Sequence, residues 1–312
     1  MISSFSSLIR VAMINILVFI MAIAAYPSFA AADSVASYKL PSISSTYTIE
    51  YRNTSQSDLF PLMQSSKPPG ETNEQSQVRT EELSRSVITS ISGLCETHVI
   101  GKDTDGYLVR FRMPKAKVRF VVDGRSASEE ITKISRLLSL GVIFSQTPSG
   151  AIKKLWLDPS AGQVVMGSIK TLLAMTQVVM PEEGVSAKSW DTTEQDQTGS
   201  HLVRYTREAG TDTIIRFRKQ KISHIKPRKT VGMQNNQLEP AYIPQGSMLV
   251  EFAGASGRFT SISGTESYSI VINNNSVGHS NTDFSMRFLK AATLSSTAQI
   301  DVLKKHQNSL ST

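Results

Sequence analysis

The sequence predicts a mainly β protein: one large antiparallel curved sheet or open β-barrel, with two internal helices packed against it. Three observations support this prediction. Stretches in which apolar and polar residues alternate recur along the chain. Short turns rich in Gly, Asn, Asp and Ser separate these stretches, which is typical of antiparallel neighbours. Two internal stretches instead place apolar residues at helical spacing.

The chain begins with the features of a secretory signal peptide. Arg10 is the only charge ahead of Asp33, and the uncharged run Val11–Ala25 follows it. Small residues then mark two expected cleavage points, after Ala30 or after Ala32. The apolar run is shorter than the roughly 20 residues that a spanning helix needs. We therefore expect residues 1–32 to be cleaved and the protein to be secreted or periplasmic, with a retained membrane anchor as the alternative.

The first expected strand is the alternating stretch that closes Ala36–Arg52. Tyr47, Ile49 and Tyr51 alternate there with polar residues, which indicates a strand with one buried face. The segment 53–79 that follows is polar and contains several prolines. This composition predicts a loop inserted into the domain.

The part of the sequence from Leu83 to Val122 is expected to form a meander of antiparallel strands. Its first strand is Ser86–Ile100, and an Asp-Gly turn ending at Gly106 leads into the next. Cys95, the single cysteine of the chain, lies in the first of these strands. A lone thiol cannot form an internal disulfide, so we expect Cys95 to be a small buried apolar residue.

A first amphipathic helix is predicted after Ser126. Ser126 and Glu129 have the spacing of a capping box, in which each side chain accepts a hydrogen bond from a backbone amide of the first turn. Apolar residues then recur at helical spacing, and Gly141 ends the stretch. These apolar residues are Ile131, Ile134, Leu137 and Leu138.

A hairpin and a second helix follow. The stretches Val142–Gln146 and Ala151–Leu157 flank a Pro-Ser-Gly turn and are expected to pair as two strands. A break at Asp158 and Pro159 then leads into a helix that begins near Gly162. Its apolar positions include Val165, Ile169, Leu172 and Leu173, which we expect to pack in the core.

The remainder of the chain is expected to return to strands. Alternating stretches separated by Gly, Ser and Asn turns continue to about residue 290, so residues 33–290 are predicted to form a single β-rich domain. Residues 291–312 are mostly polar and are expected to be a tail or a short helix. The expected strands are His201–Glu208, Thr213–Ile222, Met248–Ala253, Arg258–Ser263, Tyr268–Ile272 and Phe284–Leu289.

Positive charge exceeds negative charge by seven, and only one segment, Arg216–Lys229, concentrates it. One interpretation is a solvated strand face with an adjoining turn. The other is a contact surface for anionic lipid or another polyanion. An exported address argues against nucleic acid as the partner. The cations of this segment are Arg216, Arg218, Lys219, Lys221, Lys226, Arg228 and Lys229.

No motif of the sequence assigns a catalytic, cofactor-binding or metal-ligating residue. The chain lacks a nucleophile elbow, a Walker loop, a dinucleotide fingerprint and a paired-histidine zinc motif. The segment Trp190–Gly199 holds three acids, which we interpret as a polar loop; a calcium site or an acid–base pair is the alternative. A dispersed hydrolase site would have to join His201 or His224 to an acid from Asp191–Asp196.

The segment Phe144–Met180 runs through a hairpin, an Asp-Pro break and an apolar helix. It resembles the N-terminal lipoprotein domain of the vitellogenin and large lipid transfer family, and the resemblance extends over about residues 144–199. The resemblance implies a β-barrel-like module with a central helix, used for lipid handling or partner docking. The matching residues are Phe144, Gly150, Ile152, Ile169, Lys170, Leu172, Leu173 and Gln177.

These observations favour a non-enzymatic, secreted or periplasmic β-sheet module that binds or transports lipid, or docks a protein partner. No cofactor is expected. A hydrolase with a dispersed active site and a structural or adhesion protein of the cell surface are the alternatives. The residues expected to contact an acyl chain lie on the second helix and the adjoining strands: Phe144, Ile152, Ile169, Leu172 and Leu173.

Overall fold

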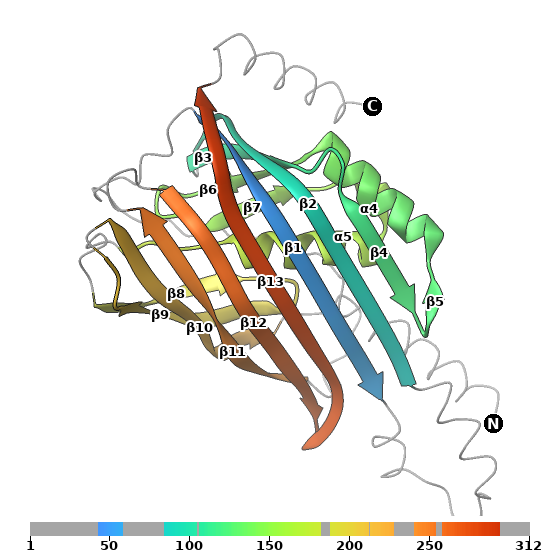
Figure 1. The fold of residues 1–312 in the computed structure, drawn as a ribbon. Coiled ribbons are helices and arrows are strands. Elements are labelled where there is room, and N and C mark those ends of the chain that lie inside the picture. The colour runs from blue at the N-terminus through green and yellow to red at the C-terminus, as the bar shows by residue number, and fades with distance from the viewer. Residues whose placement is uncertain are drawn as a thin grey trace, which may run out of the picture.

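The computed structural model describes residues 43–58, 84–104, 106–181, 188–211, 213–227, 240–253 and 258–293. In this part of the chain the strands form one large antiparallel sheet that is nearly closed into a barrel (Figure 1). Neighbours along the sheet follow the order β7-β6-β3-β2-β1-β13-β12-β11-β10-β9-β8, with β4 on β2 and β5 on β4. The predicted fold class is confirmed.

The strands and helices alternate only in the middle of the chain, where both α-helices of the described part lie between strands. Neither helix has the length and apolar character needed to cross a membrane. In chain order the elements are β1 (Ile43–Asp58), β2 (Ser84–Asp103), β3 (Gly106–Arg112), β4 (Lys117–Val122), β5 (Arg125–Ser126), α4 (Ser128–Leu140), β6 (Val142–Gln146), β7 (Ile152–Trp156), a 3-10 turn (Pro159–Ala161), α5 (Gln163–Thr176), β8 (Ser189–Gln195), β9 (Gly199–Glu208), β10 (Ile214–Pro227), β11 (Ala241–Ala253), β12 (Arg258–Ile272) and β13 (Asn275–Thr293).

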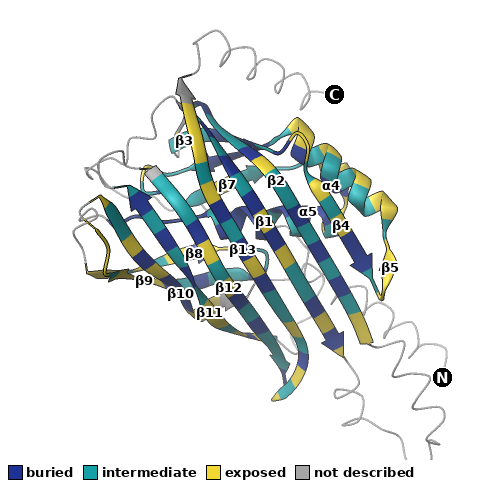
Figure 2. Ribbon diagram, viewed as in Figure 1, coloured by how far each residue is buried: buried dark blue, intermediate teal, exposed yellow. Residues whose placement is uncertain are grey.

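Strand β1 lies at the centre of the sheet, between β13 and β2. Its inward side chains Tyr47, Ile49 and Tyr51 are buried, whereas Glu50 and Arg52 are exposed. Figure 2 shows the same alternation of buried and less buried residues along the long strands. Side chains of a strand point to opposite faces in turn, so the alternation read from the sequence is the inside and outside of the barrel.

Two predicted boundaries of the domain are wrong. The insert expected at 53–79 does not begin at residue 53, because β1 continues to Asp58 and pairs with both neighbours: Asn53 lies opposite Thr282 of β13 and Thr89 of β2. Pairing on both sides satisfies the backbone, which outweighs the low strand preference of these polar residues. The tail expected from residue 291 also begins later, because Ile43 pairs with Thr293. The rest of both segments and the leader lie outside the described residues.

Helix α5 occupies the interior. Ile169 and Leu172 are fully buried, and the polar Thr171 is buried with them. Most residues of α5 are buried, which is typical of a core helix rather than a surface one. Figure 1 shows α5 on the far side of β1 and β2. The helix expected from about residue 162 is therefore present and forms the centre of the barrel.

Helix α4 is amphipathic as expected, with Ile134 and Leu138 buried, but its predicted capping box does not form. Ser126 belongs to β5 and pairs with Val121 of β4. Ala127 then caps the helix without a side-chain hydrogen bond, and its amide donates to the carbonyl of Phe120. Ser126, which the sequence pattern assigned to the helix cap, is therefore part of the short β4–β5 hairpin instead.

The barrel is left open between the edge strands β7 and β8, which do not pair with each other. An extended segment after α5 partly fills this seam. The Met180 amide donates to the carbonyl of Ser149 at 2.7 Å, and the Trp190 indole N–H donates to the carbonyl of Val179 at 2.8 Å. Gly150 permits this close approach, because a Cβ on it would lie 2.1 Å from the Val178 carbonyl oxygen. Hydrogen bonds to one linking segment, rather than a strand ladder, therefore join the two edges.

Candidate functional site

A small pocket lies in the seam, with α5 as its floor. Its volume is about 20 Å³. This is enough for about one water molecule. It is lined from β7 by Ile152 and Leu155, from α5 and its end by Lys170, Leu173, Ala174 and Gln177, and from the end of β8 by Gln195 and Asp196. Both sheet edges and the central helix therefore meet at one place.

Gln177 connects the helix to both sides of the seam. Its side-chain oxygen accepts a hydrogen bond from the Ile152 amide at 3.3 Å. Its backbone carbonyl accepts one from the Lys219 ammonium at 2.8 Å. Its side-chain nitrogen is buried without a hydrogen-bond partner within the described residues. An unpaired buried donor costs free energy, so this amide is available to an acceptor that enters the seam.

The structure brings together two of the five residues expected to contact an acyl chain. Ile152 of β7 and Leu173 of α5 both line the seam pocket. Ile169 and Leu172 are fully buried in the core, and Phe144 is buried on β6, and none of the three lines this pocket. The sequence pattern identified the helix and the hairpin, but it could not show which helical face lies under the open seam.

Buried charges lie next to the seam, inside the sheet formed by β8, β9 and β10. The Lys219 ammonium lies 2.7 Å from the Glu194 carboxylate, and their side chains are 1% and 4% exposed. The Tyr205 hydroxyl donates to the same carboxylate. Burial and the nearby Glu194 raise the pKa of Tyr205 well above its usual value, so this tyrosine remains a hydrogen-bond donor.

Asp196 is the centre of a second buried group. Its carboxylate lies 2.9 Å from the Lys221 ammonium and 3.2 Å from Nε2 of His201, and it accepts a hydrogen bond from Tyr268 at 2.7 Å. Burial alone would raise its pKa. The charges of His201 and Lys221, with a hydrogen bond from Thr198, outweigh burial and hold the pKa of Asp196 well below its usual range.

Lys221 also lies 2.7 Å from the carboxylate of Glu266 on β12. Burial alone would lower the pKa of Lys221, but Asp196 and Glu266 raise it well above its usual value. The buried groups thus contain three carboxylates and two ammonium groups, the carboxylates being Glu194, Asp196 and Glu266 and the ammonium groups Lys219 and Lys221. We call these five residues the buried charge cluster. It crosses the interior from β8 to β12.

The basic surface proposed from the sequence is therefore wrong in two of its residues. Lys219 and Lys221 alternate with outward residues on β10 and face the interior, because carboxylates on β8 and β12 are placed to pair with them. Arg216 and Arg218 are exposed, but each pairs with a carboxylate on the neighbouring strand. The side chain of Lys226 lies outside the described residues, as do residues 228 and 229.

The acidic segment Trp190–Gly199 is not a polar loop, because most of it is strand β8. It pairs with β9, and Trp190 stacks on Tyr205 with ring centroids 4.8 Å apart. The signal that could have identified the strand is the alternation at Trp190, Thr192 and Glu194, which places an acid on the inward face. The interpretation of Asp191, Glu194 and Asp196 as solvent-exposed loop residues overlooked this alternation.

His201 and Asp196 do come together, as a dispersed hydrolase site would require, but their arrangement is unsuited to catalysis. The Thr198 hydroxyl donates to Asp196 at 2.6 Å and therefore accepts from Nε2 of His201, at 2.8 Å. The Thr198 hydroxyl and the Asp196 carboxylate thus both lie at Nε2 of His201. In a catalytic triad the hydroxyl and the carboxylate lie at opposite nitrogens of the imidazole ring. His201 is fully buried, and its Nδ1 has no hydrogen-bond partner among the described residues.

The single thiol of the chain is equally enclosed. Cys95 is fully buried, as expected, and burial raises the pKa of its thiol well above the usual value. A thiol held in this form is a poor nucleophile. Within the described residues no three His, Cys, Asp or Glu side chains are grouped so that they could hold a metal ion.

A structure of lipovitellin, described as showing lipid–protein interactions in lipovitellin, is similar to this chain. The TM-score is 0.52 at 9% sequence identity, and the match covers 82% of this chain. The chain spans about a quarter of that protein, since only 26% of the lipovitellin chain is matched. No protein-family model and no curated protein sequence matches. The resemblance stated from residues 144–199 is thus supported at the level of fold.

Proposed function

We propose that this protein is an exported, non-enzymatic module that binds lipid, with an acyl chain held in the seam between β7 and β8. The observation that carries the proposal is the seam itself: two unpaired sheet edges meet over the central helix. Ile152, Leu155, Leu173 and Ala174 give the pocket an apolar wall. The similarity in fold to lipovitellin supports a role in lipid binding.

The closed seam holds about one water, so an acyl chain requires β7 and β8 to move apart. No ladder of hydrogen bonds joins these strands in the described part of the chain. Separation therefore breaks side-chain contacts and a few bonds to the linking segment, such as that from Met180 to Ser149. Each methylene that enters would contribute about 0.8 kcal/mol of burial, which offsets this loss.

The hydrolase alternative has one observation in its favour, the 3.2 Å distance between His201 and Asp196. Both groups are buried, and the carboxylate is already paired with Lys221. Asp196 lines the seam pocket, but Lys221, Tyr268 and Thr198 already hold its carboxylate, so a substrate could engage it only by breaking the buried charge cluster. A structural role for this pair is therefore the better interpretation, and the protein is proposed to have no catalytic activity.

Lipid extraction and native mass spectrometry of the purified full chain test the proposal, followed by titration with a fluorescent sixteen-carbon fatty acid. Ile152→Lys places a charge in the seam and should weaken fatty-acid binding by about tenfold or more. The matched control is Ile88→Lys, which adds the same charge at a half-buried position of β2 that does not line the seam. Absence of both co-purifying lipid and fatty-acid binding would overturn the proposal, as would equal weakening by both substitutions.

A further inference from the structure

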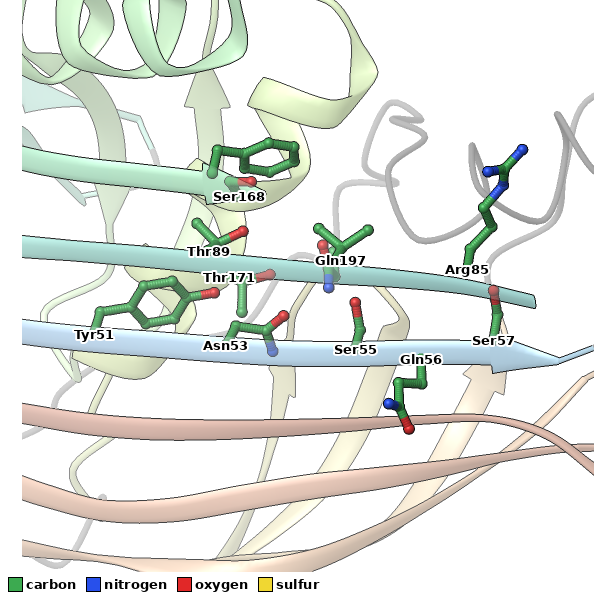
Figure 3. A pocket seen from close by; sticks show the side chains of 12 residues that line it. Tyr51, Asn53, Ser55, Gln56, Ser57, Arg85, Thr89, Ser168, Thr171 and Gln197 are labelled. Carbon is green, nitrogen blue, oxygen red and sulfur yellow. The ribbon is translucent and has the colours of Figure 1, made fainter. Parts of the chain in front are cut away.

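A second pocket lies on the opposite side of α5, against β1 and β2. Its volume is about 30 Å³. This is room for about two water molecules. Inward residues of β1 change character along the strand, from Tyr47, Ile49 and Tyr51 to Asn53 and then to serines. The inward face of β1, apolar over its first part, thus presents hydroxyl and amide groups to the pocket at this end (Figure 3).

Three hydroxyl groups of this pocket have no hydrogen-bond partner among the described residues. Ser55 and Ser57 of β1 are 7% and 8% exposed, and Thr89 of β2 is 3% exposed. Buried hydroxyl groups are normally paired. The oxygen atoms of these three residues are not among the sealed, unpaired polar atoms of the core, so the three hydroxyls form a polar wall open to the pocket, and a ligand whose groups both donate and accept hydrogen bonds can bind to it.

The remaining polar groups of the wall are already oriented. The Asn53 side-chain nitrogen donates to Ser280 at 2.9 Å and to Thr282 at 2.8 Å, both on β13. Figure 3 shows its oxygen turned the other way, toward Thr89 and Thr171. A fixed acceptor thus stands beside the three free hydroxyls. Tyr51 and Phe120 add aromatic surface to the same pocket.

The one cation of the lining is already paired. Arg85 forms an ion pair with Asp123, whose carboxylate also accepts the Ser86 amide at 2.8 Å. These contacts hold the pKa of Asp123 below its usual value against the opposing effect of burial, so it stays ionised beside Arg85. Asp123 therefore balances the charge of Arg85, and the lining favours a neutral ligand over an anionic one.

From this wall, its neutrality and its size, we propose a binding site for a vicinal diol, the group shared by sugars and by the glycerol of lipid headgroups. Two adjacent hydroxyl groups take the place of two waters and reproduce their hydrogen bonds to Ser55, Ser57 and Thr89. The carbon atoms between them pack on Tyr51 and Phe120. The site is separate from the seam and does not depend on the lipid proposal.

Saturation-transfer NMR with glycerol and with D-glucose tests the site, and 1,3-propanediol serves as a diol of the wrong spacing. Transfer is expected to glycerol or glucose and not to 1,3-propanediol. Thr89→Val removes a hydroxyl with little change of shape, and Ser55→Ala removes another. Each should weaken binding about fivefold or more. Thr54→Val and Ser90→Ala are matched controls, because they face outward on the same two strands.

Vesicles distinguish the two sources of the diol. Binding to vesicles with phosphatidylglycerol that exceeds binding to equally charged phosphatidylserine vesicles, which lack a diol, and that is lost in Thr89→Val identifies a headgroup. Transfer to the free compounds alone identifies a soluble sugar or polyol. Equal transfer to 1,3-propanediol, no transfer to any diol, or equal loss in the outward controls would overturn the proposal. Ile152→Lys should leave diol binding unchanged, so the diol proposal and the lipid proposal can be refuted independently of each other.

Discussion

Apart from the hydroxyl-lined end of β1 and β2, one half of the barrel interior is apolar, whereas the other half buries ammonium and carboxylate groups among its apolar side chains. Where β1 and β2 face α5, Ile49, Ile91 and Leu172 are fully buried. Where β8, β9 and β10 close the other side, Lys219 and Lys221 are also buried, at 1% and 6% exposed. Apolar groups gain free energy from leaving water whatever their neighbours are, whereas a buried charge is tolerated only with its partner. The first half therefore tolerates approximate packing, and the second requires each partner to be present.

The largest effect is expected from removing one ammonium group of the buried charge cluster. Lys221→Met leaves Asp196 and Glu266 buried without their shared cation, which should lower the free energy of unfolding by about 3–5 kcal/mol. Urea denaturation measures this. Arg218→Met on the same strand removes an exposed partner of Glu208 and should cost less than about 1 kcal/mol. Similar costs for both variants would contradict the comparison.

The charged half should also be the acid-sensitive half. The pKa of Asp196 is lowered on folding, so its stabilising contribution is present above the unfolded value of about 3.9 and is lost as the pH falls below it. Urea denaturation at pH 6 and pH 3 should show a smaller loss of stability on acidification in Asp196→Asn than in the unchanged protein. Glu251→Gln, at a more exposed ion pair, is the control and should retain most of the acid sensitivity.

The apolar half is the part of the molecule that the sequence predicts well. Period-two alternation at Tyr47, Ile49 and Tyr51 depends only on local chain geometry, and the structure confirms it. Lys219 and Lys221 show the same alternation with Phe217, but hydropathy assigns lysine to water. Their burial depends on Glu194 and Glu266, which are distant in sequence. Pairing across the barrel is a property of the tertiary fold, so no local pattern could predict it.

The seam pocket and the hydroxyl-lined pocket could be predicted only in part, for the same reason. Gly150 and the helix after Gly162 are recognisable from the sequence. The contact between Gly150 and Val178, and therefore the position of the opening, depends on where the chain returns after α5. The free hydroxyl of Ser55 lies in the polar segment predicted to be a loop, whereas Thr89 lies in the predicted strand Ser86–Ile100. Strand pairing, invisible in composition, places them inside the barrel.

A smaller loss of stability is expected at the seam, where backbone conformation and a steric contact matter rather than apolar packing or buried charge. Gly150→Ala should destabilise by about 2–3 kcal/mol, because its backbone lies at φ 102° and the new Cβ would meet the Val178 carbonyl oxygen. Gly162→Ala is the matched control: its φ is 81°, and a Cβ there meets nothing within 4 Å. It should cost about 1 kcal/mol less. Equal thermal stability of the two variants would show that the contact does not hold the linking segment.

The smallest effect is expected from trimming the apolar half. Ile169→Val removes one methyl group at a fully buried position of α5 and should cost about 0.5–1.5 kcal/mol by urea denaturation. No partner is left unpaired, and neighbouring apolar side chains relax into the space. Its cost should also be the same at pH 6 and pH 3, since no titratable group is touched. A loss near that of Lys221→Met, or one that changes with pH, would mean that the two halves of the interior are coupled through α5.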